Sequence, residues 1–318
     1  MKKDKIKILD CTLRDGGYYN NWQFKKELIN EYLKVMQLIK VDYVEIGFRF
    51  IDKIKTKGPC AYSEENFLKS LKIPENLKIG IMINAADYVY SKDILSLVQK
   101  NFIIKKKSII SLVRIACHSN ELELIKPLVN WLKRSGYKVG INIMQIPELS
   151  FKEIKKSVLL IKKTKADILY FADSLGSLNS IKTRKIIKNI RLFWKGPMGI
   201  HTHDNMGKAM ENSIAAINNS VEWIDSTVTG MGRGPGNTKT EYAILELKSK
   251  KLSNYKLVSL LKLIKDYFDP LKEKYKWGSN PYYYFAGLNS IHPSFVQEML
   301  TSNFYNPRKY MALRDQLL

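Results

Sequence analysis

The chain has 318 residues, a formal net charge of +23 and 45% hydrophobic residues, which suits one large globular domain or two small ones. No stretch is apolar over the length that a membrane helix needs, and three cysteines at unrelated spacings predict neither a disulfide framework nor a zinc site. We therefore expect a protein of the reducing cytoplasm that has no membrane partner.

The positive charge comes from 44 lysines and only nine arginines. Arginine is the residue that reads bases and binds phosphates in a bidentate way. The lysines are spread over nearly every predicted helix, as in the run 105–107. We interpret the charge as solvated helix faces and expect no nucleic-acid partner. Nucleic-acid binding is kept as an alternative, and it would show as a steep salt dependence of retention on DNA or RNA.

Largely apolar runs recur along the first three quarters of the chain. Each is apolar throughout rather than alternating, which is typical of strands in a parallel sheet that is covered on both faces. The eight runs are Ile6 to Cys11, Tyr43 to Phe48, Leu77 to Ile83, Ile109 to Ala116, Lys138 to Met144, Ile168 to Ala172, Pro197 to Ile200 and Trp223 to Val228.

Stretches with helical periodicity lie between these runs, at Glu27 to Ile39, Leu122 to Leu132 and Ile181 to Leu192. Eight strand and helix units in about 250 residues predict an α/β protein with a (β/α)8 TIM barrel. A doubly wound open sheet is the alternative, but the first strand lacks the glycine-rich nucleotide turn expected there. From about Leu252 onward the rhythm changes to two or three helices. We therefore expect a barrel over residues 1–251 and a C-terminal helical extension, packed on the barrel, over residues 252–318.

Polar residues follow most of the predicted strands, and in a TIM barrel the carboxyl ends of the strands form the active site. Their convergence on one face indicates a functional site more strongly than any single motif does. The candidates are Arg14 and Asp15 after the first strand, Glu45 near the second, Arg114 within the fourth, Asp173 and Ser174 after the sixth, His201 and His203 after the seventh, and the glycine-rich segment 230–237 after the eighth.

Two of the four histidines stand at alternate positions, His201 and His203, where side chains of a strand point to the same face. With Asp15 they could supply one carboxylate and two imidazoles to Mn²⁺, Mg²⁺, Zn²⁺ or Fe²⁺. Each residue taken alone has a simpler interpretation, as a surface histidine or a turn aspartate. The glycine-rich segment could bind a phosphate or approach the metal site closely. The pair Asp173 and Ser174 could bind a substrate carboxylate, orient a histidine or cap the following helix.

Four segments together resemble the DRE-TIM metallolyase superfamily, and most closely the catalytic domains of 4-hydroxy-2-oxovalerate aldolase type. They are Leu9 to Gly17, Glu45 to Phe48, His201 to Asn205, and Gly230 to Asn237. The match runs in order from residue 6 to about residue 245.

The resemblance implies a divalent metal, usually Mn²⁺ or Mg²⁺, held by Asp15, His201 and His203. Asn237 matches a position that ligates the metal in some members, and Arg14 matches the arginine that stabilises the enolate of a 2-oxo acid such as pyruvate. The implied enzyme is a class II aldolase or lyase that acts on a 4-hydroxy-2-oxo acid. Its expected partners are a 2-oxo acid with an aldehyde or acyl-CoA, further copies of the chain and, by analogy, a partner dehydrogenase.

One position departs from the aldolases, which have a histidine as base three residues after the motif aspartate. Here that position is Tyr18, and a tyrosine is ordinarily a poor base at neutral pH. We predict Arg14 and Tyr18 as catalytic residues, with His118 and a metal-bound water as other candidates for the base. Glu45, Arg114, Asp173 and Ser174 are the predicted substrate-binding residues. Two alternatives keep the barrel: a Claisen-type synthase that joins an acyl-CoA to a 2-oxo acid, and a catalytically silent binding module.

Overall fold

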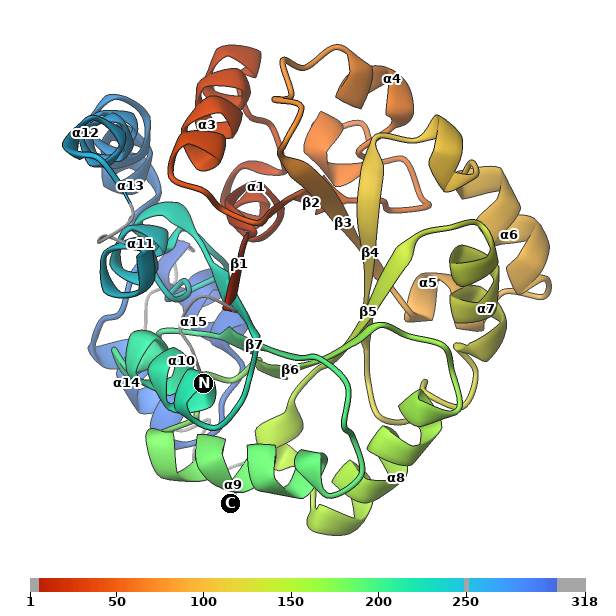
Figure 1. The fold of residues 1–318 in the computed structure, drawn as a ribbon. Helices are drawn as coiled ribbons and strands as arrows, with labels where there is room; N and C mark the ends of the chain where they lie inside the picture. Colours follow the sequence, from red (N-terminus) through yellow and green to blue (C-terminus); the bar gives the residue numbers. More distant parts are fainter. Residues whose placement is uncertain (1–5, 249–251, 302–318) are drawn as a thin grey trace.

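The computed structural model describes residues 6–248 and 252–301. Eight parallel strands pair in sequence order, and β8 pairs with β1, so the sheet closes into a barrel with helices around it (Figure 1). The strands are β1 (Lys7–Asp10), β2 (Tyr43–Phe48), β3 (Lys78–Asn84), β4 (Ile110–Cys117), β5 (Lys138–Ile143), β6 (Ile168–Asp173), β7 (Met198–Thr202) and β8 (Trp223–Ser226).

The predicted TIM barrel is confirmed, and each predicted strand boundary lies within two residues of the observed one. The runs form strands because their side chains are buried on both faces: strands β2 and β6 are buried at every position. The open-sheet alternative is wrong because β1 and β8 are hydrogen-bonded neighbours.

Helices follow the strands in the expected alternation. They are α1 (Thr12–Asp15), α2 (Gly17–Asn20), α3 (Lys26–Leu38), α4 (Glu65–Lys69), α5 (Ala86–Val89), α6 (Ile94–Asn101), α7 (Lys126–Arg134), α8 (Phe151–Lys162), α9 (Ser180–Arg191), α10 (Ala209–Asn218) and α11 (Thr240–Lys248), with short 3-10 turns η2 (Pro59–Ala61), η3 (Lys105–Lys107), η4 (Ile146–Glu148) and η5 (Val228–Gly230).

One helix starts later than predicted. We expected a helix from Leu122, but residues 122–124 form a turn and α7 begins at Lys126. Pro127 explains the shift, because a proline has no N–H to donate and fits the first turn of a helix better than its interior.

The C-terminal extension contains more helices than the two or three expected. Its described part comprises α12 (Asn254–Leu263), a π-helical turn η7 (Ile264–Phe268), α13 (Asp269–Tyr275), α14 (Pro281–Leu288) and α15 (Pro293–Thr301). Helix α12 packs beside α3 on the outside of the barrel (Figure 1). The predicted boundary at residue 251 falls in the undescribed segment 249–251, and residues 302–318 also lie outside the described part, so this division stays a prediction.

The extension is fixed to the loops that follow β7 and β8. Trp277 donates its indole N–H to the carbonyl of Thr229 at 3.1 Å, and Ser279 donates its hydroxyl to the carbonyl of Asn205 at 2.7 Å. It therefore covers the loops at the carboxyl ends of these strands, the end at which a barrel enzyme carries its site. Within the described residues, every helix is too short or too polar to cross a bilayer.

Candidate functional site

Helix α1 brings Arg14 and Asp15 to the mouth of the barrel. It begins directly after β1, where the Thr12 amide donates to Asp10 Oδ1 at 2.9 Å. The Thr12 hydroxyl in turn accepts the Val228 amide at 2.8 Å, which ties this turn to the segment after β8. Both charged side chains of α1 are buried as a result, with Arg14 4% and Asp15 2% exposed.

The predicted metal ligands Asp15, His201 and His203 lie together, although Asp15 is far from the two histidines in the sequence. One ligand atom from each lies within 4.8 Å of the others, and all three residues are buried. His201 lies in β7 and His203 directly after it. The set offers one carboxylate oxygen and two imidazole nitrogens, which suits a divalent ion of intermediate softness.

Unpartnered polar atoms test whether this set fits an ion. Asp15 Oδ2, His203 Nδ1 and Asn237 Oδ1 are fully buried, and none has a hydrogen-bond partner among the described residues. A buried polar atom without a partner costs about 1 to 3 kcal/mol, so three such atoms in one place need an explanation. A shared cation provides one, and we conclude that these residues fit a divalent metal.

Asn237, at the end of the glycine-rich loop, is held against the histidines. Its amide nitrogen lies 3.2 Å from His201 Nε2 and donates to the carbonyl of Thr202 at 3.1 Å. Its carboxamide oxygen faces Gly232, where an added Cβ would stand 1.8 Å from Asn237 Oδ1 and 2.9 Å from Asp15 Oδ2. The glycine-rich loop therefore closely approaches Asp15, His201 and His203, which we call the metal set. Close approach to the metal site was one of the two interpretations that the sequence left open for this loop.

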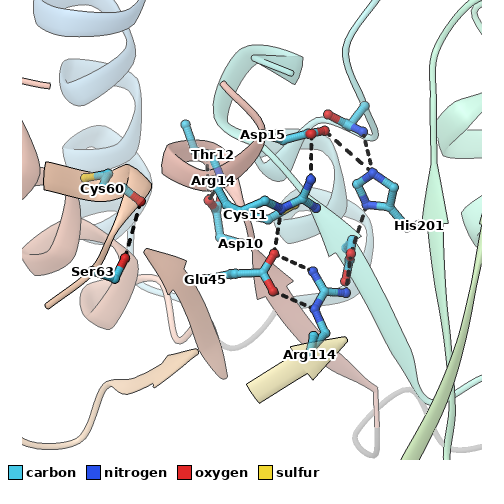
Figure 2. Close-up of polar contacts among 12 residues, drawn as sticks. Asp10, Cys11, Thr12, Arg14, Asp15, Glu45, Cys60, Ser63, Arg114 and His201 are labelled. Atoms are coloured by element: carbon cyan, nitrogen blue, oxygen red, sulfur yellow. Dashed lines mark hydrogen bonds and ion pairs between the residues drawn. The ribbon is translucent and has the colours of Figure 1, made fainter. Parts of the chain in front are cut away.

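A network of buried ion pairs begins at the metal set (Figure 2). Arg14 donates from Nη1 to Asp15 Oδ1 at 2.6 Å and from Nε to Glu45 Oε2 at 2.7 Å. Its remaining nitrogen, Nη2, is buried and has no partner within the described part of the chain. Arg14 thus holds Asp15 in place and keeps its Nη2 amino group available at the site.

The ion-pair network continues from Glu45 through Arg114 and Asp225 and ends at His201. Arg114 donates from Nε and Nη2 to the two oxygens of Glu45, each at 2.7 Å, and from Nη1 to Asp225 Oδ2 at 2.6 Å. Asp225 Oδ2 lies 2.9 Å from His201 Nδ1. This contact directs the other ring nitrogen, Nε2, toward Asp15, from which it is 3.6 Å away. A carboxylate that orients a metal-ligating histidine is common in metal sites.

Burial and neighbouring charges shift the pKa values of the set in different directions. Burial would raise the pKa of Asp15, but the Arg14 guanidinium and His201 outweigh it and lower the pKa. Burial would lower the pKa of His201, but the nearby carboxylates of Asp15 and Asp225 outweigh it and raise the pKa. Burial and the nearby His201 hold the pKa of His203 well below its usual range. Asp15 is therefore anionic and His203 neutral, as ligands must be.

A second group of possible ligands shares His201 with the first and combines it with Cys11 and Asp225. Asp225 Oδ2 is already used by Arg114 and His201 Nδ1. Burial raises the pKa of the Cys11 thiol well above its usual range, which keeps the thiol protonated. The group with Asp15 and His203 is therefore the better metal site.

Tyr18 lies on α2 next to the site and is half-buried. Its ring packs edge-on against Trp22 and Phe48, with centroids 5.0 and 6.1 Å away, and the Arg233 guanidinium lies 5.2 Å from its centroid. No described residue forms a hydrogen bond with the Tyr18 hydroxyl. The other candidate base, His118, is half-buried after β4 and contributes to the electrostatic environment of His292.

The structure gives the predicted substrate-binding residues specific contacts. Glu45 and Arg114 are fully buried and paired with each other under the metal set. Asp173 accepts the amides of Ser177 and Leu178, and burial raises its pKa to about 7. Ser174 accepts the amide of Gln145 at 3.1 Å. The proposed cap of the next helix is wrong, because Asn179 caps α9. A role of these four residues in substrate binding stays a prediction.

Sequence reasoning missed Asp10, Asp225 and His292. Asp225 lies within the predicted strand 223–228, where an acid among apolar residues was a usable signal. Asp10 receives hydrogen bonds from Tyr32 and Thr240, and it fixes β1 to α3 and α11. His292 comes from the extension and acts electrostatically on His203, a proximity that no local pattern could reveal.

Comparison with known proteins agrees with this geometry. The model of the HMGL-like family matches residues 105–266, just over half of the chain. The chain belongs to the HMGL-like family. The resemblance to the DRE-TIM metallolyases is thereby confirmed.

Individual relatives of this HMGL-like protein carry related names. A 4-hydroxy-2-oxovalerate aldolase of Carboxydothermus hydrogenoformans is 27% identical over 246 residues, which cover 76% of this chain and 70% of the relative. An oxaloacetate decarboxylase of Mycobacterium tuberculosis is 22% identical over 246 residues, which again cover 76% of this chain and 70% of the relative. The crystal structure of the N-terminal domain of a candidate aldolase from Bacteroides vulgatus has a TM-score of 0.80 and 30% identity, and the match covers 96% of this chain and 99% of that one.

Proposed function

We propose that this HMGL-like protein is a divalent-metal-dependent class II aldolase that cleaves or forms a carbon–carbon bond in a 4-hydroxy-2-oxo acid. One observation carries the proposal: buried, unpartnered ligand atoms of Asp15, His203 and Asn237 gather beside His201 and the free nitrogen of Arg14. Relatives named 4-hydroxy-2-oxovalerate aldolase, which are carbon–carbon lyases, support this choice. Mn²⁺ or Mg²⁺ is the proposed ion.

Each residue has a role that follows from its contacts. Asp15, His201, His203 and Asn237 would hold the ion, which supplies a Lewis acid for the keto oxygen of a 2-oxo acid when bound. Arg14 donates from its free Nη2 to a substrate oxygen that gains negative charge during the reaction. Because its other two donors are fixed by carboxylates, this guanidinium needs no rearrangement to do so.

Two of the predicted substrate-binding residues support a different role. Every contact of Glu45 described above is with a guanidinium, and Arg114 is enclosed between Glu45, Asp225 and the Tyr170 ring. This arrangement favours positioning of Arg14 and His201 by Glu45 and Arg114. Asp173 and Ser174 remain the proposed substrate contacts at the end of β6.

Tyr18 is the proposed proton-transfer residue. It occupies the position of the aldolase histidine, its ring is fixed by three neighbours, and its hydroxyl has no partner in the described part of the chain. A Tyr18→Phe variant keeps the ring packing and removes the hydroxyl. We expect it to lose most of the deuterium exchange at the methyl group of pyruvate, measured by NMR in D₂O with Mn²⁺ present. Exchange at the wild-type rate would exclude Tyr18.

Retro-aldol cleavage tests the function itself. With Mn²⁺, the wild-type protein should release pyruvate from 4-hydroxy-2-oxopentanoate, and Asp15→Asn should release none while its circular dichroism spectrum is unchanged. Asp52→Asn is the matched control, because Asp52 is an exposed aspartate that takes part in none of the contacts described for the site. Thiol release from acetyl-CoA with a 2-oxo acid would favour the Claisen-type synthase instead. Tight Mn²⁺ binding without turnover of any 2-oxo acid would favour the silent barrel.

The assembly is proposed by analogy alone. Homo-oligomerisation, a partner dehydrogenase and a cytoplasmic location are predictions that a sedimentation experiment, a pull-down with the dehydrogenase and cell fractionation would test.

A further inference from the structure

Arg233 occupies a fixed position between the metal set and the C-terminal extension. The residue before it, Gly232, lies against Asn237 Oδ1 and leaves no room there for a Cβ. The residue after it, Gly234, has a positive φ of 62° and accepts a hydrogen bond from the Tyr19 hydroxyl at 2.6 Å. Both neighbours hold the backbone of Arg233, so its side chain starts from a defined point beside the metal set.

The extension closes the other side of this loop. An added Cβ at Gly234 would stand 3.0 Å from Pro293 Cβ and 3.1 Å from the Tyr283 ring. The Gly234 amide also donates to Gln297 Oε1 at 3.2 Å. Arg233 therefore lies where β8, the metal set and helices α14 and α15 meet.

The guanidinium of Arg233 has no anionic partner among the described residues. It lies over the Tyr18 ring, and its Nε is buried without a hydrogen bond. A half-buried cation in this state lacks the anion that usually offsets the cost of desolvation.

When the formal charges of the buried network, the metal and the substrate in the proposed holoenzyme are added, the positive charge of Arg233 is the one that is not balanced. Three buried carboxylates and two buried guanidiniums give the network one net negative charge: Asp15, Glu45, Asp225, Arg14 and Arg114. A divalent ion turns this into one positive charge, and the carboxylate of a 2-oxo acid cancels it. Arg233 adds a further positive charge, which a second anionic group would neutralise.

We propose that Arg233 binds an anionic group, a carboxylate or a phosphate, at the end of the substrate remote from the 2-oxo acid. This inference rests on the proposed function and narrows its substrate class to 4-hydroxy-2-oxo acids with a charged tail, or equivalently to aldehydes that carry an anion. A guanidinium suits this task because its planar fork binds both oxygens of a carboxylate or phosphate at once.

A matched pair of ligands tests the proposal without turnover. 2-Oxoglutarate and 2-oxopentanoate have the same chain length, but only the former has a charged tail. With the Mn²⁺-loaded protein, calorimetry should show about tenfold or greater preference for 2-oxoglutarate, the size of one charge-assisted interaction. Arg233→Gln should reduce this preference to about twofold or less. A 2-oxo acid with a terminal phosphonate is the second arm and separates a carboxylate site from a phosphate site.

Two controls make the result specific. Arg184 is an exposed arginine on α9, so Arg184→Gln should keep the wild-type preference. Oxalate has no tail, and a comparable loss of oxalate and 2-oxoglutarate binding in Arg233→Gln would assign Arg233 to the first carboxylate and overturn the proposal. A wild-type protein with no preference for either charged ligand would overturn it as well.

Turnover separates this inference from the proposed function. If the charged-tail preference depends on Arg233 but no 4-hydroxy-2-oxo acid is cleaved, the anion site stands and the aldolase assignment fails. If both charged and neutral substrates are cleaved equally well, the aldolase assignment stands and the anion site fails.

Discussion

A Gly232→Ala substitution provides a direct test of the metal site, because it adds one methyl group at the point where the loop meets the ligands. The new Cβ would stand 1.8 Å from Asn237 Oδ1, so the carboxamide must retreat by about 1.2 Å to reach 3.0 Å. That movement breaks the 3.1 Å hydrogen bond from Asn237 to the Thr202 carbonyl and displaces a candidate ligand. The Cβ would also press on Asp15 Oδ2, 2.9 Å away.

We expect the substitution to lower the metal affinity strongly and to change the stability of the fold only slightly. Loss of one hydrogen bond costs about 1 kcal/mol, and disturbance of a residue that supports a metal costs about 10- to 100-fold in affinity. The φ of Gly232 lies outside the left-handed region, so alanine imposes no backbone strain there. We expect Mn²⁺ affinity to fall by 10- to 100-fold, while the free energy of unfolding without metal changes by about 1 kcal/mol.

Mn²⁺ titration followed by electron paramagnetic resonance measures the affinity, and urea denaturation with a chelator measures the stability. Gly80→Ala is the matched control, because its Cβ would make ordinary contacts of 3.5 Å with Leu112. Wild-type Mn²⁺ affinity in Gly232→Ala would refute the assignment of Asp15 and Asn237 as ligands.

Three further substitutions probe the buried network and the extension. Arg114→Met leaves the carboxylates of Glu45 and Asp225 without their partner, and it should cost about 3 to 5 kcal/mol in urea denaturation; an unchanged midpoint would contradict the network. Asp225→Asn weakens the support of His201 and should lower Mn²⁺ affinity by about 10- to 100-fold with an unchanged circular dichroism spectrum; calorimetry with wild-type affinity would argue against this role. His292 has a folded-state pKa of about 4, below its ordinary 6.5, so between these values the unfolded chain binds more protons and stability falls on acidification. His292→Gln should therefore lose less stability than the wild type between pH 6.5 and 4 in the presence of a chelator, and parallel curves would exclude the effect.

The barrel could be predicted because each strand is marked by the composition of its own short stretch of sequence. Apolar runs such as 138–143 and 168–173 are buried on both faces, so composition alone marks them. The proximity of Asp15, His201 and His203 could be predicted because a barrel gathers whatever follows its strands at one end. That rule needs no knowledge of long-range contacts.

The remaining features depend on contacts between distant segments. Asp225 acquires its role from Arg114, which lies 111 positions away, and from His201 on the neighbouring strand. His292 reaches the site only because α14 and α15 fold back over the loop after β8. Neither relation leaves a periodic pattern in the sequence. The start of α7 was predicted four residues early because apolar spacing was given more weight than Pro127.

The hydrogen bonds between the extension and the loops after β7 and β8 should affect the rate at which the proposed metal exchanges. Trp277 and Ser279 are bonded to the same loops that carry His203 and Asn237. Peripheral helices open more readily than buried barrel strands in native-state fluctuations. Exchange of the proposed ion with solution should therefore follow the rate at which these helices open, and a more stable contact with the loops would slow both the binding and the release of the metal.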